Sequence, residues 1–180
     1  MANHLRCGIF VDNQNIRGCG GYQTDMAALR QHVEQQGQVV VAQVFVAYDA
    51  RSQSEGVDSL MRHTRYRRYL QQVGFDLVER QPKRRTRRGV EWLERDCDTL
   101  MAGRLVYHSL IARLEKVFLV SGDGDFVDVV RLLQHSGREV EVIAMRSISA
   151  ELLRTAGSFC DGRTIPGFVL AADPPRASAS

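Results

Sequence analysis

The stretch Val117-Phe118-Leu119-Val120-Ser121-Gly122-Asp123-Gly124-Asp125-Phe126 decides the fold. Its first four residues are apolar, as in a buried strand, and the run then ends in two glycines and two aspartates. From Phe126 onward, apolar residues recur at helical spacing until Ser136-Gly137. The stretch therefore predicts a buried strand, a tight turn that carries carboxylates, and a helix.

The same alternation of strand and helix continues along the chain. Further strands are expected at 7–11, 39–48, 75–78 and 140–145, and further helices from Thr24 or Asp25 to Gly37, over about 55–73, over about 92–114 and from Ser149. Apolar strands that alternate with helices favour a mainly parallel sheet covered on both faces. The prediction is an α/β, three-layer αβα domain over 1–170, followed by a disordered Pro/Ala/Ser-rich tail at 171–180.

Composition excludes several classes of protein. The chain has 180 residues, 44% hydrophobic and 25% charged, which is typical of one globular domain. No apolar run approaches the roughly 20 residues of a membrane helix, and Asp12 interrupts the N-terminal run too early for a signal peptide. Four scattered cysteines without a CxxC pair fit neither a disulfide scaffold nor a zinc knuckle. A cytoplasmic protein is expected.

The basic residues are concentrated in one segment. Residues 80–88, RQPKRRTRR, hold six of the 24 basic residues and no acid, which leaves 18 basic against 21 acidic residues elsewhere. This concentration predicts a local contact with a polyanion. The side chains expected to contact phosphates are Lys83, Arg84, Arg85, Arg87 and Arg88.

Acidic side chains follow two of the expected strands. Asp12 ends the first strand, with Asn15 three residues on, and Asp123 and Asp125 follow the fourth. A third acidic group, Glu94, Asp96 and Asp98, lies near the start of the helix at about 92–114. Ligands of α/β sheets bind where parallel strands end, so these groups are expected to share a pocket.

Clustered carboxylates indicate a metal site. Like charges a few ångströms apart resist simultaneous ionisation unless a cation is present. Oxygen ligands favour Mg²⁺ or Mn²⁺ over zinc. Such ions bind a phosphate, stabilise its developing charge and lower the pKa of an attacking water. The predicted chemistry is phosphodiester hydrolysis, with the basic segment holding the nucleic acid.

Three motifs together resemble the NYN domain, and within it the LabA-like branch, a relative of the PIN nucleases. They are Phe10-Val11-Asp12-Asn13-Gln14-Asn15-Ile16, Asp96-Cys97-Asp98 and Val120-Ser121-Gly122-Asp123-Gly124-Asp125-Phe126, followed by Gly137-Arg138-Glu139-Val140-Glu141-Val142. The resemblance spans about 7–160. It implies a Rossmann-like sheet with central strand order 3-2-1-4-5 and a metal-dependent endoribonuclease acting on single-stranded or flexible RNA, with DNA as a possible partner.

The resemblance also assigns roles. Asp12, Asp98, Asp123 and Asp125 match the family's metal-binding aspartates and would hold Mg²⁺ or Mn²⁺, while Asn15 and Ser121 match residues that support the site. Arg104 departs from the pattern, because many relatives carry an aspartate there. An arginine at this position would reshape the metal site, bind phosphate, or mark a member with weakened catalysis.

Several alternatives stay open. The aspartates could cap helices or turns, and the basic run could be a solvated loop. A haloacid dehalogenase-type phosphatase would need an aspartate two residues after Asp12, where Gln14 stands. A non-enzymatic RNA-binding or regulatory module would keep the basic segment without the chemistry.

Overall fold

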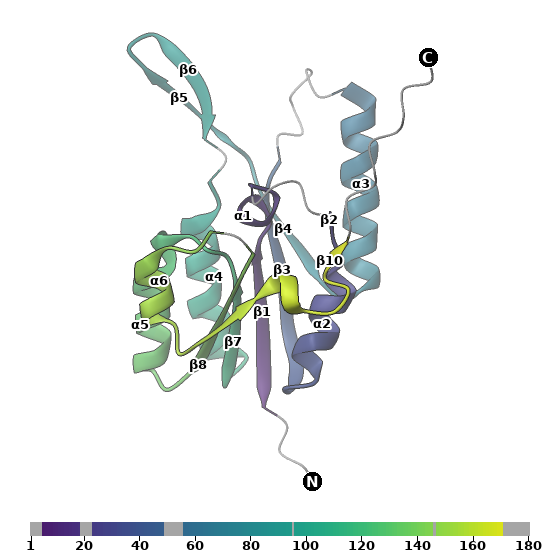
Figure 1. Ribbon diagram of the computed structural model, residues 1–180. Coiled ribbons are helices and arrows are strands. Elements are labelled where there is room, and N and C mark those ends of the chain that lie inside the picture. The colour runs from purple at the N-terminus through teal and green to yellow at the C-terminus, as the bar shows by residue number, and fades with distance from the viewer. Residues whose placement is uncertain (1–4, 19–22, 49–55, 95, 146, 171–180) are drawn as a thin grey trace.

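A computed structural model describes residues 5–18, 23–48, 56–94, 96–145 and 147–170, and only the backbone of 18, 23 and 56–59. A six-stranded sheet forms the centre of the molecule (Figure 1). Its strands in spatial order are β4 (Asp76–Arg80), β3 (Gln38–Ala47), β1 (Arg6–Asp12), β7 (Lys116–Val120), β8 (Glu139–Ala144) and β9 (Ser158–Asp161). Every neighbouring pair is parallel.

The predicted strand order is confirmed. The strands expected third, second, first, fourth and fifth along the chain are β4, β3, β1, β7 and β8, in this spatial order. Strand β9 extends the sheet beyond β8, and sequence analysis missed it because Ser158-Phe159-Cys160-Asp161 is not an apolar run. The short strands β2 (Gln23–Thr24) and β10 (Val169–Leu170) pair antiparallel in a separate small sheet.

Helices cover both faces of the sheet, which confirms the three layers (Figure 1). Helices α2 (Met26–Glu34) and α3 (Gly56–Gln72) pack on one face, against β1 side chains such as Ile9 and Val11. The other face is covered by α4 (Asp98–Ile111), α5 (Val127–His135) and α6 (Ala150–Thr155), which pack around Phe10. Successive β1 residues alternate between the two apolar clusters, as the pleat requires.

Local signals place most helix ends as expected. The Asp25 side chain caps α2 by accepting the Ala27 N–H at 2.8 Å, and Ser149 caps α6. Helix α2 ends at Glu34, short of Gly37. A short 3₁₀ turn, η2 (Gly124–Phe126), precedes α5, and a second one, η3 (Gly162–Thr164), follows β9. No helix of the described residues is long and apolar enough to cross a bilayer.

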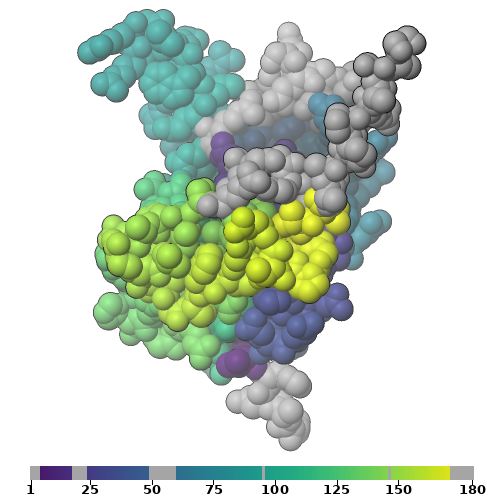
Figure 2. Space-filling model, in the orientation of Figure 1, coloured from purple at the N-terminus to yellow at the C-terminus, as the bar shows by residue number. Residues whose placement is uncertain are grey.

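The expectation of a helix over about 92–114 is wrong at its start. Residues Val90–Glu94 form strand β6, which pairs antiparallel with β5 (Lys83–Arg87) around a turn at Arg88 and Gly89. Both turn residues have positive φ, 52° and 77°. The β5–β6 hairpin stands clear of the body in Figures 1 and 2. The expected tail at 171–180 and helix start at Glu55 lie outside the described residues.

Candidate functional site

Asp12 is buried at the carboxyl end of β1, with only 5% of its surface exposed. Its Oδ1 accepts the backbone N–H groups of Gln14 and Asn15, each at 3.0 Å, so it caps the short helix α1 (Asn13–Gly18). Burial raises the pKa of Asp12, against the lowering effect of the hydrogen bonds it accepts. The capping role foreseen for Asp12 is confirmed, and it leaves the carboxylate at the rim of the sheet.

Two polar side chains join the ends of the neighbouring strands β1 and β7. Ser121, also buried, donates its hydroxyl to Asp12 Oδ2 at 3.1 Å and accepts the Asp123 N–H at 3.2 Å. Asn15 Oδ1 accepts the Gly122 N–H at 3.0 Å. The two residues expected to support the site therefore hold the turn that carries Asp123 next to Asp12.

Gly122 has no room for a side chain. A Cβ built on it would lie 1.9 Å from the carbonyl oxygen of Ser147, and its own carbonyl accepts the Ser149 N–H at 2.8 Å. The glycine thus lets the turn after β7 pack directly on the backbone that follows β8. This close approach fixes where the next residue, Asp123, lies.

Asp123 is also a helix-capping acid, as foreseen, whereas Asp125 lies within the turn that Asp123 caps. The Asp123 side chain accepts the Asp125 N–H at 3.0 Å and caps η2. Asp123 lines a hollow of about 340 Å³ with Asp12, Gln14, Asn15, Asp96 and Asp98. Asp125 instead lines an adjoining hollow of about 580 Å³, which shares Asp96 and Asp98 and also contains Asp128 and Glu151.

Asp98 is the first residue of α4 and lines the smaller hollow with Asp12, Asp96 and Asp123. We call these four carboxylates the acidic rim. Its backbone N–H donates to Asp96 Oδ1 at 2.6 Å. Burial, helped by Asp96 and by the charges of Asp12 and Asp123, raises the pKa of Asp98 to about 7. Carboxylates from three distant parts of the chain therefore lie close enough to influence one another's pKa values. Asp96, which sequence analysis named only as one of three neighbouring acids, lines both hollows.

The rim carboxylates fit a hard divalent cation by their chemistry. All their donors are oxygen, and a bound cation would offset the repulsion that raises the pKa of Asp98. Within the described residues, however, no three of these carboxylates bring ligand oxygens within 4.8 Å of one another. Direct binding of one ion by three of them requires side-chain rotation, whereas binding through water does not.

The basic segment supplies strand β5 and part of the turn of the exposed β5–β6 hairpin, and does not form an irregular loop. Residues opposite each other in an antiparallel pair share a face, so Lys83, Arg85 and Arg87 lie on the face of their partners Glu94, Trp92 and Val90. Trp92 is 45% exposed. Sequence analysis missed it as a binding residue because it was placed in a helix. Arg85 and Glu94 form an ion pair at 3.0 Å.

The base of this hairpin is attached to the acidic rim. Arg80, at the end of β4, donates to the carbonyl oxygen of Asp96 at 3.0 Å. Arg104 is not part of the rim, because it is exposed on α4 and lines a separate hollow with Thr99, Leu100, Gly103 and Tyr107. The structure therefore joins the base of the hairpin, but not Arg104, to the acidic segment at Asp96.

Comparison with known proteins defines the class. The NYN domain family model matches residues 6–165, so the chain belongs to the NYN family, whose domains are of the PIN-like nuclease type. A crystal structure of a protein of unknown function from Vibrio parahaemolyticus is similar, with a TM-score of 0.74 and 23% sequence identity over 94% of this chain and 99% of that chain. No curated protein matches. The structural likeness supports the fold, and the family supports a nuclease-type hydrolase that uses divalent metal.

Proposed function

We propose that this protein is a metal-dependent endoribonuclease of the LabA-like branch that cleaves single-stranded or flexible RNA. The observation that carries the proposal is the convergence of Asp12, Asp98 and Asp123 on one hollow at the carboxyl end of the sheet. The family's nuclease character supports it.

The proposed ligands of Mg²⁺ or Mn²⁺ are Asp12, Asp98 and Asp123, directly or through water, with Asp125 in the adjoining hollow. When bound, the ion would stabilise the charge that develops on the scissile phosphate and acidify a nearby water. Asp96 is a further candidate because it lines both hollows.

The chain's own residues would supply orientation and RNA binding. Ser121 and Asn15 hold the carboxylates of β1 and the β7 turn in register. The cationic side chains of the hairpin would bind phosphates of the RNA backbone. Trp92 would stack on a base, as aromatic side chains do in single-strand binding. The Arg80 contact with Asp96 would keep bound RNA close to the acidic hollow.

The test is cleavage of single-stranded RNA by the purified protein with Mg²⁺, Mn²⁺ or EDTA. Asp12→Asn keeps a capping side chain but loses the charge, so cleavage should fall by at least about 100-fold with the fold intact. Asp76→Asn is the matched control, because Asp76 is exposed at the start of the edge strand β4 and lines neither acidic hollow. Equal cleavage by wild type and Asp12→Asn would remove the proposed centre.

A second candidate is an RNA-binding or regulatory NYN module with weak or no catalysis. The spacing of the carboxylate oxygens and the arginine at 104 favour it. Such a module would bind RNA equally well with EDTA present and would not cleave it with Mn²⁺. A phosphatase is disfavoured, since Gln14 lines the hollow where that chemistry needs a second aspartate.

A further inference from the structure

A second group of metal-binding side chains lies away from the acidic rim. His32 of α2, Glu141 of β8 and Cys160 of β9 each offer one ligand atom, and these three atoms all lie within 4.8 Å of one another. Among the residues the structure describes, no other set of His, Cys, Asp or Glu meets this criterion. The three ligands are a nitrogen, an oxygen and a sulfur, in contrast to the all-oxygen rim.

The sheet register explains how the two strands contribute. Cys160 lies beside Ile143 in the parallel β8–β9 pair, and Glu141 is two residues before Ile143, so the three side chains share one face. That face packs against α2 through Leu29 and Val33. His32 follows Leu29 by one helical turn, which places its ring over the same part of the sheet.

One ring nitrogen of His32 is an unsatisfied hydrogen-bonding group within the described part of the chain. This atom, Nε2, is buried and has no hydrogen-bond partner among the residues that the structure describes. A buried polar atom without a partner is costly, so such atoms in folded proteins call for an explanation such as a bound ion. Coordination of a metal by Nε2 would remove this cost.

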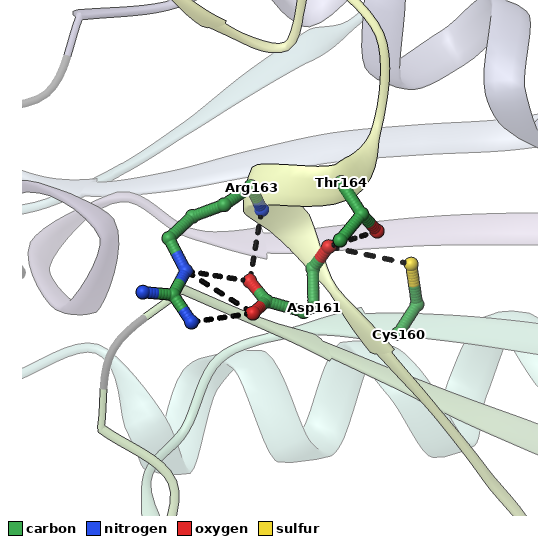
Figure 3. Close-up of polar contacts among 4 residues, drawn as sticks. All are labelled: Cys160, Asp161, Arg163 and Thr164. Atoms are coloured by element: carbon green, nitrogen blue, oxygen red, sulfur yellow. Dashed lines mark hydrogen bonds and ion pairs between the residues drawn. The ribbon is translucent and has the colours of Figure 1, made fainter.

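The turn after β9 fixes the sulfur of Cys160 (Figure 3). Its thiol donates to the carbonyl oxygen of Asp161 at 3.7 Å, and the Thr164 hydroxyl donates to the same oxygen at 2.7 Å. The Asp161 carboxylate caps η3 and is held by the Arg163 guanidinium. The sulfur therefore lies near the end of β9, next to an ordered turn and beside the other two ligands.

Lys116 limits which ions this cluster can take. Its ammonium pairs with Glu141 Oε2 at 2.8 Å and donates to Gln36 Oε1 at 2.8 Å. This positive charge opposes a cation held only by charge, such as Mg²⁺. An ion with high affinity for thiolate and imidazole would tolerate it, because those bonds are strong.

We propose that His32, Glu141 and Cys160 form a zinc site, separate from the acidic rim, that ties α2 to β8 and β9. Three protein ligands of these types leave a fourth position for water in a tetrahedral Zn²⁺ centre. Binding converts the Cys160 thiol to a thiolate and releases its proton to solvent, so the charge balances.

The test is titration of the reduced, chelator-treated full chain with Co²⁺, as a coloured substitute for Zn²⁺, with excess Mg²⁺ present. We expect one equivalent to produce a thiolate-to-cobalt charge-transfer band that Zn²⁺ then abolishes. Cys160→Ser should remove the band, and His32→Gln should weaken Zn²⁺ binding by at least about tenfold. Cys97→Ser and His135→Gln, which change a cysteine and a histidine outside the cluster, should keep both.

Each outcome decides the proposal. A wild-type protein without the band, or a band that persists in Cys160→Ser, would overturn it. If Cys160→Ser does not fold, His32→Gln decides, because unchanged Zn²⁺ affinity in that variant also overturns it. Binding at the all-oxygen rim gives no thiolate band, so the result is independent of the nuclease proposal.

Discussion

Ser121 donates its hydroxyl to Asp12 Oδ2 at 3.1 Å and thereby joins two strand ends that are 109 residues apart in sequence. The hydroxyl oxygen of Ser121 in turn accepts the Asp123 N–H at 3.2 Å. One buried hydroxyl thus sets the positions of two rim carboxylates. This dual contact distinguishes Ser121 from a serine that only fills space.

Ser121→Ala should affect both stability and cleavage. It leaves a buried Asp12 oxygen and the Asp123 N–H without this partner, so the free energy of unfolding should fall by about 1–3 kcal/mol in urea. Ser109→Ala is the control, because Ser109 is equally buried but donates only to the Leu105 carbonyl within α4. Loss of RNA cleavage in both variants alike would show that Ser121 has no special role at the rim.

Gly122→Ala should be strongly destabilising, since the new Cβ would lie 1.9 Å from the Ser147 carbonyl oxygen. We expect a loss of more than about 3 kcal/mol, because backbone must move. Gly103→Ala, in the middle of α4, is the opposite case, because no atom of the described residues lies within 4 Å of the new Cβ. It should stabilise the protein by about 1 kcal/mol. Thermal unfolding of both variants measures the contrast, and equal effects would contradict it.

The strands and the rim residues were predictable because their signals are local. Each apolar run identifies a strand, and Asp12 and Ser121 stand directly after two of them. The resemblance to NYN domains then gave the order of the strands. Local signals do not give the distances between side chains of different segments. Asp125 lies in the adjoining hollow, and Arg104 lies outside both acidic hollows.

Sequence analysis missed the β5–β6 hairpin as well as β9, and the reason for the hairpin is its exposure to solvent. The β5–β6 hairpin is exposed on both faces, so its sequence lacks the alternation of apolar and polar residues that marks a half-buried strand. The helical spacing of Cys97, Met101 and Leu105 then favoured a helix, whose expected start at about Trp92 was too early. The His32, Glu141 and Cys160 cluster has no sequence signal at all, because three separate elements supply one ligand each.

The pH dependence of stability should reveal the charge on the rim. Because the pKa of Asp98 is raised to about 7 from 3.8, the folded protein retains a proton that the unfolded chain has lost between about pH 4 and 7. Without metal, stability should therefore fall as pH rises through this window. Asp98→Asn should flatten the fall, and Asp128→Asn, with a side chain 94% exposed, should not. Urea unfolding in EDTA at several pH values measures this, and parallel slopes for wild type and Asp98→Asn would contradict it.

The hairpin face that carries Trp92 should dominate RNA affinity. Lys83→Gln with Arg87→Gln removes two cations from that face, so the slope of log affinity against log salt should fall by about 1.4 on single-stranded RNA. Trp92→Ala should weaken binding by about 1–3 kcal/mol with an unchanged slope, because stacking releases no counterions. Arg113→Gln, at the far end of α4, controls for the loss of a surface charge. Fluorescence anisotropy at several salt concentrations with EDTA present separates these effects from cleavage. A salt slope unaltered by the double substitution would mean that RNA does not lie along the hairpin.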